Sequence, residues 1–580
     1  MSKVKPTIYD PQKHTAVEGI KVNSNYLRGT LQQSLQSEIT GAIADDDQMI
    51  IKFHGSYQQD DRDLRAERRK QKLEPLYSFM IRARLPGGVA SAEQYKVLAK
   101  VAQDYGHSSL RLTTRQTYQW HGIVKRDLKK TIAGINRALV DSIAACGDVN
   151  RNVMANPLFE QSKLHTEVYQ WSKKISEHLL PNTNAYHEIW LDGEKVESTE
   201  EPIYGKTYLP RKFKIAIAVP PNNDVDIYAN DIGLIAISDG EKLKGFNILV
   251  GGGMGSSHND PETYPRAASV IGFCKPEQAL EVVESILKVQ RDYGNREVRK
   301  LARLKYTIDG LTVEGFKEVL ADYLGWSLQP AQPFSFEHNG DRYGWIKSDD
   351  GKWHLTLYIH SGRIKDTEQS QVFSGLLKIA DLLVGQSDGI QSGGRDGEFR
   401  CSPNQNLIIS NVSDENKTAI EKILQQHNIS IGQTETPTRL NALACVAFPT
   451  CALAMAEAER YLPTLLDKIE EQLEQYGIAD VPINIRMTGC PNGCARPYLG
   501  EIGFVGKAPG KYNLYLGASH TGDRVNKLYR ENINEAEILK ELEPLFASFA
   551  ELRKPTESFG DFVIRQGYVL AVHNGRDFHA

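Results

Sequence analysis

The chain has 580 residues, 40% of them hydrophobic, a length that allows several buried cores and exceeds one ordinary domain. Its formal net charge of −4 excludes a general attraction to nucleic acid or to an anionic membrane surface, so any basic chemistry must be local. No stretch approaches the length of a membrane span and the N-terminus lacks an apolar signal segment, so we expect a cytoplasmic protein with no membrane partner.

Residues 1–74 are mostly polar and charged, and they end in the basic run RDLRAERRKQKLEP. They show little apolar periodicity, so we expect an extended arm. The basic run has two interpretations, a solvated surface or a docking segment for a partner protein.

An α+β pattern begins at residue 75. The segment YSFMIRARL alternates like a strand, Ser91 and Gln94 form a capping box that opens a helix, and the polar strand pair SSLRLTTRQTYQWHGIV follows. The order of strand, helix and polar strand returns at residues 346–428, which indicates a duplicated α+β module. We therefore divide the chain at residues 1–74, 75–144, 145–345, 346–428 and 429–580.

Two α/β regions occupy the units 145–345 and 429–580. The first has strands at FKIAIAV, GLIAIS and KGFNILV and a helix at PEQALEVVESILKVQRDYG. The second has a long helix expected from AMAEAERYL to EQLEQYG and a closing α/β section. The segment GQSDGIQSGGRDG, which starts at Gly385, is predicted to be a Gly-rich surface insertion.

Seven cysteines are too few and too unevenly placed for a disulfide framework. Four of them form two pairs, Cys445 with Cys451 in ACVAFPTCALA and Cys490 with Cys494 in MTGCPNGCARP. Four thiolates can hold a four-iron cluster or a structural zinc ion, or can be unliganded. The apolar neighbours of the first pair favour a buried redox centre. The remaining three cysteines are expected to be small buried hydrophobic residues: Cys146, Cys274 and Cys401.

The two cysteine segments, ACVAFPTCALAMAEAER and TGCPNGCARP, resemble the signature of siroheme-containing sulfite and nitrite reductases. In that family all four cysteines bind a 4Fe-4S cluster and the last one also binds the siroheme iron, so the resemblance implies that Cys494 is the bridging ligand. The resemblance extends from about Tyr77 to Asp561. It implies a multi-domain α+β siroheme sulfite/nitrite reductase fold, with ferredoxin-like modules duplicated about a pseudo-twofold axis through the cofactors. Units 145–345 and 429–580 then bind siroheme, and the latter also binds the cluster.

A siroheme carries eight carboxylates, so its pocket needs basic groups where a core would exclude them. With a period of two residues, RLTTRQTYQWH has one wholly polar face, although a turn can interrupt it. Arg82 and Arg84 share a side of IRARLPGG in the same way. A solvated sheet face would also explain these patterns. By resemblance to the family's siroheme-binding segments, the cofactor-binding candidates are Arg84, Arg111, Thr113, Arg115, Gln119, His121 and, in SPNQNLIIS, Gln405.

The segment LPRKFKIAIAV predicts an anion site. Its large apolar residues alternate with Lys212, Lys214, Ala216 and Ala218, so two lysines project together above small residues. Two like charges at close range predict a negatively charged ligand. In the resembling family, this segment and the segment NRN (residues 150–152 here) supply cations that bind the substrate. The resemblance therefore implies the substrate site Arg82, Arg151, Lys212 and Lys214.

The segment GFNILVGGGMG is a strand followed by glycines. It lacks the GxGxxG spacing and a directly following helix, so we expect no dinucleotide site. We expect these glycines to allow close approach to the macrocycle.

The function implied by the resemblance is the six-electron reduction of sulfite to sulfide, as in sulfate assimilation and cysteine biosynthesis. Siroheme nitrite reduction to ammonia uses the same cofactors and is the alternative, and a non-catalytic zinc-binding protein is an alternative of another class. The sequence has no flavin or nicotinamide motif, so the electrons must come from another protein. That donor is expected to be an NADPH-dependent flavoprotein reductase subunit, with a ferredoxin as the alternative.

Overall fold

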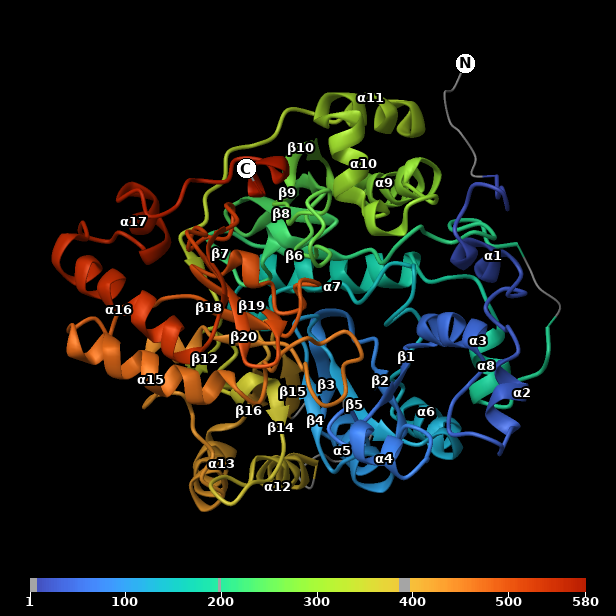
Figure 1. The fold of residues 1–580 in the computed structure, drawn as a ribbon, viewed down its shortest axis with the longest axis horizontal. Helices are drawn as coiled ribbons and strands as arrows, with labels where there is room; N and C mark the ends of the chain where they lie inside the picture. The colour runs from blue at the N-terminus through green and yellow to red at the C-terminus, as the bar shows by residue number, and fades with distance from the viewer. Residues whose placement is uncertain (1–7, 197–199, 385–396, 580) are drawn as a thin grey trace.

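The computed structural model describes residues 8–196, 200–384 and 397–579, so the predicted Gly-rich insertion lies almost wholly outside the described residues. Two five-stranded antiparallel sheets form the lower part of Figure 1. The first sheet has the order β1 (Ser56–Asp60), β2 (Tyr77–Arg82), β5 (Tyr118–Ile123), β4 (Leu110–Leu112) and β14 (Arg363–Ile364). The second has the order β12 (Gly344–Lys347), β13 (Trp353–Leu357), β16 (Leu407–Val412), β15 (Glu398–Cys401) and β3 (Val89–Ser91).

Each of these sheets takes its last strand from the other repeat. Strand β14 follows β13 in the chain but pairs with β4 of the first sheet. Strand β3 follows β2 but pairs with β15 of the second sheet. This reciprocal exchange confirms the duplicated module and relates its two copies by pseudo-twofold symmetry.

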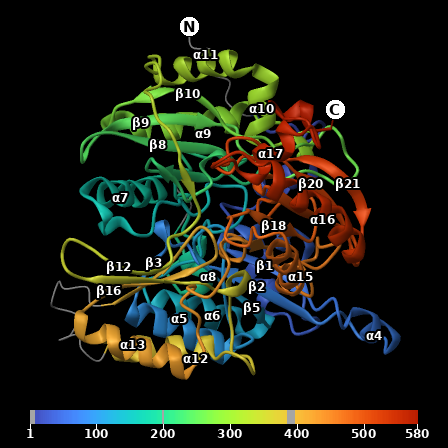
Figure 2. The same ribbon diagram turned by 90° about the vertical axis from the view of Figure 1, so that its left-hand side faces the viewer.

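Four helices cover one side of the two sheets. They are α5 (Ala92–Tyr105), α6 (Leu128–Arg137), α12 (Val372–Val384) and α13 (Asp414–Gln426). They form one layer at the bottom of Figures 1 and 2, in which α5 packs against α6 and α12. Helix α5 begins at the predicted capping box, where Gln94 N–H donates to Ser91 Oγ (3.2 Å) and Ser91 N–H donates to Gln94 Oε1 (2.9 Å).

A tight turn interrupts each polar strand of the repeat. Strands β4 and β5 are separated by a turn in which Gln116 has a φ of 56°. The segment predicted as one strand over residues 398–412 is likewise a hairpin, β15 and β16, with Gln405 at a φ of 67°. The two turns are equivalent, so the modules agree in this detail as well.

Two further sheets repeat a second pattern. One contains β6 (Ile215–Ala218), β8 (Ile232–Asp239), β9 (Lys242–Val250) and β10 (Ser269–Cys274), and the other contains β18 (Ile485–Thr488), β19 (Ile502–Ala508), β20 (Lys511–Leu516) and β21 (Lys527–Ile533). In each, the first two strands are parallel and the later pairs are antiparallel. Strand β17 (Leu443–Ala444) lies parallel to β18, and parallel bridges from Asn150 and Met154 place the segment around Arg151 beside β6.

Helices pack against both of these sheets. Around the first lie α7 (Lys163–His178), α9 (Ala279–Tyr293), α10 (Leu304–Leu311) and α11 (Val313–Leu324). Around the second lie α15 (Leu462–Gln475), α16 (Glu535–Leu552) and α17 (Phe559–Arg565). The helix predicted from residue 454 begins only at Leu462, because the preceding residues form the turns that follow Cys451. The remaining short elements are α8 (Ala185–Trp190), α14 (Pro437–Leu440) and the paired strands β7 (Asn222–Asn223) and β11 (His338–Asn339).

The N-terminal region is not the predicted extended arm. Helices α1 (Ala16–Val22), α2 (Leu31–Gln36) and α3 (Asp45–Ile50) fold against the body, and β1 joins the first sheet. Its charges are buried in pairs, since Lys21 Nζ lies 2.7 Å from Glu18 Oε1 and 3.6 Å from Asp148 Oδ2. Such charges look solvated in a sequence, which explains the wrong prediction. Of the helices in this region, α4 (Arg65–Lys70) alone has no buried residue, and it projects from the body in Figure 2.

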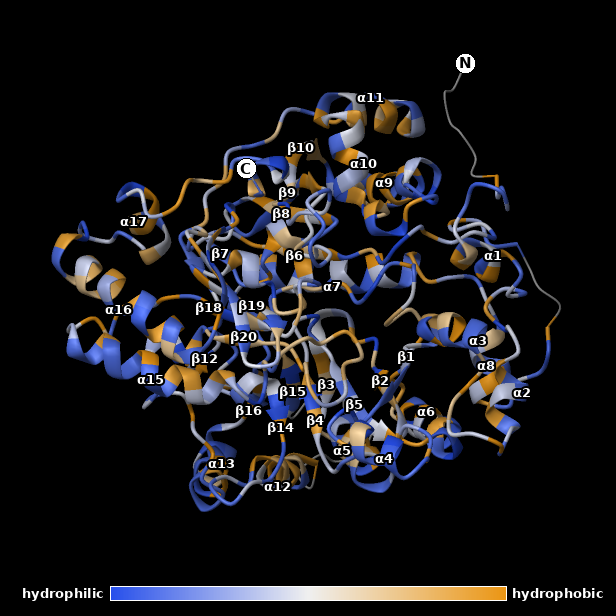
Figure 3. Cartoon of the chain, in the orientation of Figure 1, coloured by the Kyte–Doolittle hydropathy of each residue, from blue (hydrophilic) through white to orange (hydrophobic). Residues whose placement is uncertain are grey.

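The apolar residues form two main cores. One runs through both ferredoxin-like modules and the first α/β sheet, and the other fills the last unit of the chain. In Figure 3 the outer helices α15 and α16 show both blue and orange sides, as expected for helices that cover a core. Among the described residues, no helix combines the length and apolar character needed to cross a membrane.

Candidate active site

The four predicted cluster ligands lie on two neighbouring segments of the last α/β sheet. Cys445 directly follows β17, and Cys451 lies in the turn after it. Cys490 and Cys494 lie in the loop that follows β18, the strand beside β17. Gly489 N–H donates to Cys445 Sγ at 3.3 Å, so the two segments are in contact. The fold therefore brings both cysteine pairs to one end of this sheet.

Electrostatics couple the four thiols. Burial raises the pKa of Cys445, Cys451 and Cys490, the last to about 12, and the charge of Cys494 reinforces each shift. Thiolates that repel one another favour a ligand that brings positive charge, such as iron. Within the described ranges, no three His, Cys, Asp or Glu side chains converge as ligands of one metal ion. Four thiols on two neighbouring loops can supply all the protein ligands of a four-iron cluster.

Two predicted cofactor residues hold the backbone just before Cys445. Arg111 Nη2 and Gln405 Nε2 both donate to Ala444 O, each at 2.8 Å. Arg111 also forms an ion pair with Glu459, whose Oε1 accepts a hydrogen bond from Arg363 Nε at 2.6 Å. Because Arg111 and Gln405 belong to different modules, both modules fix the first cysteine segment in place.

The predicted polar face exists, but it runs across strands rather than along one strand. The register places Arg82 opposite Gln119, and Gln119 opposite Arg111. Oriented with its oxygen toward Arg82, the Gln119 amide accepts a hydrogen bond from Arg82 Nε at 2.7 Å. His121 Nδ1 is buried without a protein hydrogen-bond partner among the described residues. Burial lowers the pKa of His121, and the charge of Arg363 lowers it further. A buried polar atom without a protein partner is what a bound cofactor group would satisfy.

A second basic group surrounds Cys146. Arg82 Nη1 lies 3.2 Å from Cys146 Sγ, and Arg82 and Arg151 both donate to Ala145 O, at 3.4 and 3.1 Å. Tyr57 of β1 belongs to this group, because burial and Cys146 raise its pKa while Arg151 and Arg82 oppose the shift. Cys146 is buried as predicted, yet it also lines this basic group. The other isolated cysteines, Cys274 and Cys401, lie in the main core as predicted.

Lys212 and Lys214 lie close to Cys494. Burial lowers the pKa of Lys212 to about 8, against the charge of Cys494. Burial and the neighbouring Lys212 lower the pKa of Lys214, and Cys494 again opposes the shift. None of the largest charge effects on either lysine comes from a carboxylate. The two ammonium groups are therefore available to an anion, and the charge of Arg115 acts on the same place.

The alternation around these lysines is confirmed, with one correction. Phe213 and Ile215 pack in the main core, as the predicted large face requires. Ala216 and Ala218 are also buried, in a smaller core with Ile227 and other residues. The small-residue face is thus filled by protein, so the expected room above Ala216 and Ala218 is absent, and the anion site at the two lysines stays a prediction.

Three predicted cofactor residues form hydrogen bonds with protein groups outside the two basic groups described above. Arg84 Nε donates to Asp141 Oδ1 at 2.9 Å, and Arg84 contacts no other predicted site residue. Thr113 Oγ1 accepts from Arg115 N–H (3.1 Å) in the turn after β4, and Arg115 Nη1 donates to Asn230 Oδ1 (2.6 Å). Arg84 thus pairs with Asp141 whereas Arg82 lies at Cys146, and a contact of Arg84 with siroheme stays a prediction.

The glycine segment after β9 approaches the cysteine loop. Ser256 N–H donates to Pro491 O at 2.9 Å. A Cβ atom on Gly493, whose φ is 63°, would lie 2.3 Å from Met254 O, so this contact requires glycine. The approach to the cysteine loop explains these glycines, whereas an approach to a macrocycle remains a prediction.

The predicted site residues did not include Tyr57, Arg303, Arg363 and Glu459. Arg303 Nη2 lies 2.8 Å from Asp231 Oδ2, and its charge acts on both lysines of the site. A signal existed for Arg303, because LARLKY alternates basic and apolar residues as the lysine segment does. Glu459 gave no such signal, since its partners are distant in the sequence.

Known proteins share both the sequence and the fold. The family model "Nitrite/Sulfite reductase ferredoxin-like half domain" matches residues 71–138 and 346–427. The family model "Nitrite and sulphite reductase 4Fe-4S domain" matches residues 170–328. A sulfite reductase (NADPH) hemoprotein beta-component of Oceanobacillus iheyensis is 58% identical over 567 residues, which cover 97% of this chain and 96% of the relative. One of Staphylococcus haemolyticus is 57% identical, with 98% of each chain covered.

The chain belongs to the sulfite reductase hemoprotein beta-component family. The structure of the Mycobacterium tuberculosis NirA protein shares the fold of this family member, with a TM-score of 0.76, 24% identity and coverage of 96% of this chain and 97% of that one. Siroheme and a 4Fe-4S cluster are the cofactors of a sulfite reductase hemoprotein, and the residues present fit both groups. Four thiols on two loops in contact suit the cluster, and the buried His121 Nδ1, which has no protein partner among the described residues and lies on the face of Arg82, Gln119 and Arg111, suits a group of the siroheme.

Proposed function

We propose that this sulfite reductase hemoprotein reduces sulfite to sulfide with six electrons, at a siroheme joined through Cys494 to a 4Fe-4S cluster. One observation carries the proposal: the turn of Thr114 and Arg115 joins the last cysteine to the segments of the predicted anion site. Thr114 Oγ1 donates to Cys494 O at 2.9 Å. Arg115 donates to Asn152 O (2.8 Å), next to Arg151, and to Ile215 O, next to Lys214. A cysteine ligand and an anion site are thus adjacent. Proposed cluster ligands are Cys445, Cys451, Cys490 and Cys494.

In this proposal the chain's own residues bind the oxyanion and donate protons to it. When bound, siroheme and the cluster supply the electrons and the metal at which sulfur is reduced. Arg82 and Arg151 provide fixed positive charge, because guanidinium groups stay protonated. Lys212, whose pKa is lowered by burial to about 8, can hold a proton near neutral pH and release it to a departing oxygen. Reduction to hydrosulfide consumes six electrons and seven protons and releases three water molecules, so such a donor is needed.

We propose that the electrons come from a flavoprotein reductase subunit. The relatives are named beta-components of an NADPH enzyme, which implies an alpha partner, and a ferredoxin stays the alternative. The basic run at the end of the first unit supports a docking role, since Arg62 Nη1 donates to Cys451 O at 3.1 Å and Arg62 stacks on Phe448 at 4.5 Å. The exposed helix α4 follows Arg62 directly, so its basic surface lies near the cluster. The cytoplasm is the proposed compartment.

The experiment is steady-state kinetics of the purified protein on sulfite and nitrite with a chemical reductant. Iron, acid-labile sulfide and the visible spectrum are measured on the same sample. Sulfite turnover with siroheme absorption and about four cluster irons per chain would agree with the proposal. A strong preference for nitrite would favour the alternative substrate, and a colourless protein that contains zinc would contradict both.

A further inference from the structure

Asp226 and Arg496 occupy equivalent positions in the two α/β sheets. Each is the N-cap of a short 3-10 helix, η5 (Ile227–Ala229) and η9 (Pro497–Leu499), just before the second strand of its sheet. Both have left-handed backbones, with φ values of 46° and 54°, which residues with side chains seldom adopt. One copy carries a carboxylate here and the other a guanidinium, and the two form a buried ion pair.

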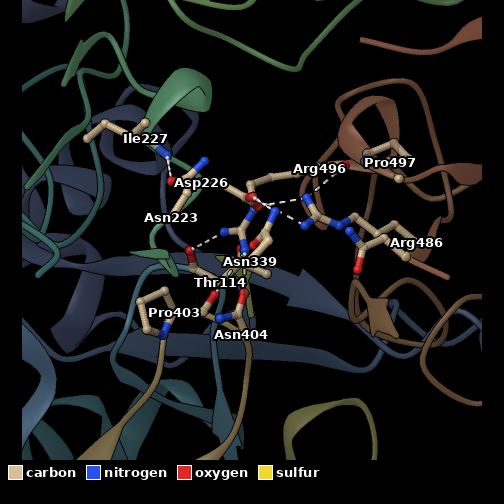
Figure 4. A network of polar contacts seen from close by, with 12 residues as sticks. Thr114, Asn223, Asp226, Ile227, Asn339, Pro403, Asn404, Arg486, Arg496 and Pro497 are labelled. Carbon is tan, nitrogen blue, oxygen red and sulfur yellow. Dashed lines mark hydrogen bonds and ion pairs between the residues drawn. The ribbon is translucent and has the colours of Figure 1, made fainter. Parts of the chain in front are cut away.

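Asp226 also holds the other end of the cysteine loop. Arg486 of β18 donates to it through Nη1 (2.6 Å to Oδ2) and Nη2 (3.2 Å to Oδ1). Arg486 precedes Cys490 and Arg496 follows Cys494, so one carboxylate ties both ends of the ligand loop together (Figure 4). Burial would raise the pKa of Asp226, but Arg486 and Arg496 lower it to about 2, so the carboxylate stays charged.

The other nitrogens of Arg496 reach both ferredoxin-like modules. Nη1 donates to Thr114 O (2.9 Å) and Nη2 donates to Pro403 O (3.0 Å). Thr114 lies in the turn between β4 and β5, and Pro403 lies in the equivalent turn between β15 and β16. Thr114 Oγ1 in turn donates to Cys494 O at 2.9 Å. The guanidinium thus joins Asp226 to the two turns, as Figure 4 shows.

We propose that Arg496, fixed by Asp226 and acting through Thr114, is a positioning residue that sets the place of the Cys494 sulfur between the cluster and the siroheme. The inference rests on the proposed function. A buried ion pair is weak evidence for stability, because desolvation offsets its attraction. The contacts of Arg496 with Asp226 and both turns fix the orientation of a ligand segment instead, and groups of this kind tune metal sites.

The first test changes only the hydrogen bond to Cys494. Thr114→Val removes the hydroxyl and keeps the shape, whereas Thr114→Ser keeps the hydroxyl. In Thr114→Val we expect a shifted siroheme absorption band, a shifted cluster reduction potential and about tenfold slower dye-driven sulfite reduction. Thr114→Ser should restore all three, and the melting temperature should stay close to wild type because Thr114 is only half-buried.

The second test changes the carboxylate. Asp226→Asn keeps the size of the side chain but removes the charge shared by Arg486 and Arg496. The control is Glu470→Gln, which removes one of the three carboxylates that surround Arg439 (Nε to Oε1 3.0 Å) on helix α15 of the last unit. We expect both variants to melt at a lower temperature, and only Asp226→Asn to shift the siroheme band and the cluster potential.

The two proposals fail in different ways. Wild-type protein isolated without siroheme or cluster iron would contradict the proposed function. Normal cofactors in the wild type, together with wild-type spectra and potentials in Thr114→Val and Asp226→Asn, would overturn only the positioning role and leave a structural clamp. If Asp226→Asn does not fold, the comparison of Thr114→Val with Thr114→Ser decides.

Discussion

The two α/β sheets share strand order and direction but carry different chemistry. Beside and before β6, the first copy presents the cations Arg151, Lys212 and Lys214. Beside β18 and at the opposite, carboxyl end of this corresponding strand, the second copy presents Cys445 and the loop of Cys490 and Cys494. The first strand of each copy is buried, so the loops at its ends can differ without loss of the sheet. The comparison teaches that one scaffold, used twice, can present cations in one copy and thiols in the other, which are the two halves of the proposed site.

The largest expected effect is on the metal-binding copy. Cys494→Ser should lose or severely perturb both the siroheme and the cluster, because one sulfur would serve two metal centres. Visible absorption and electron paramagnetic resonance of the reduced protein measure this. Cys274→Ser and Cys401→Ser are the controls, since both thiols lie in the core, and they should keep both centres. Normal signals in Cys494→Ser would remove the bridging assignment.

Lys212→Met and Lys214→Met test the anion-binding copy. The loss of one charge-assisted contact to a desolvated oxyanion should cost about 1.5–3 kcal/mol, or roughly one to two decades in kcat/KM for sulfite. Stability should change little, because burial without a carboxylate partner already disfavours both charges. Dye-driven kinetics, siroheme content and thermal melting are measured together. Full cofactor with near-normal turnover would place the substrate elsewhere, and loss of siroheme would assign the lysines to its carboxylates.

Charge reversal on α4 tests whether electrons enter on the side of the metal-binding copy. The double variant Arg69→Glu/Lys70→Glu reverses two exposed charges on α4, the helix that follows Arg62. Because it weakens attraction to a negatively charged donor surface, it should slow turnover with the flavoprotein donor by about three- to tenfold at low salt. Dye-driven turnover should not change. Lys378→Glu with Lys422→Glu, on α12 and α13, is the matched control. Deletion of residues 1–60 cannot serve here, because α1, α3 and β1 belong to the core and the first sheet.

The last expected effect concerns stability rather than activity, and it lies in the N-terminal region. Burial lowers the pKa of His54 to about 4, although its hydrogen bond to Leu27 O (2.7 Å) opposes the shift. Between pH 6.5 and 4, His54 is protonated in the unfolded chain but not in the folded chain. The free energy of unfolding should therefore fall as the pH drops through this range, by about 3 kcal/mol at most. In thermal melts, His54→Gln should lose less stability than the wild type over this range. Parallel pH curves would exclude His54 as the cause.

Local signals in the sequence determined the features that depend on near neighbours. The capping box at Ser91 predicted the start of α5, and the alternation around Phe213 predicted the buried face of β6. The spacing of the two cysteine pairs identified the four thiols that the structure places at one end of the last sheet. These signals work because a helix cap, a strand face and a ligand turn involve residues only a few positions apart.

Tertiary structure alone decided which distant groups meet. The sequence could not show that Glu459 pairs with Arg111, that β3 and β14 are exchanged, or that Asp226 faces Arg496. It also gave a wrong account of the first unit, because Glu18 and Lys21 are polar in sequence yet buried as a pair. A buried charge is costly unless it is paired, and its partner can lie anywhere in the chain, so the position of that partner becomes known only when the chain is folded.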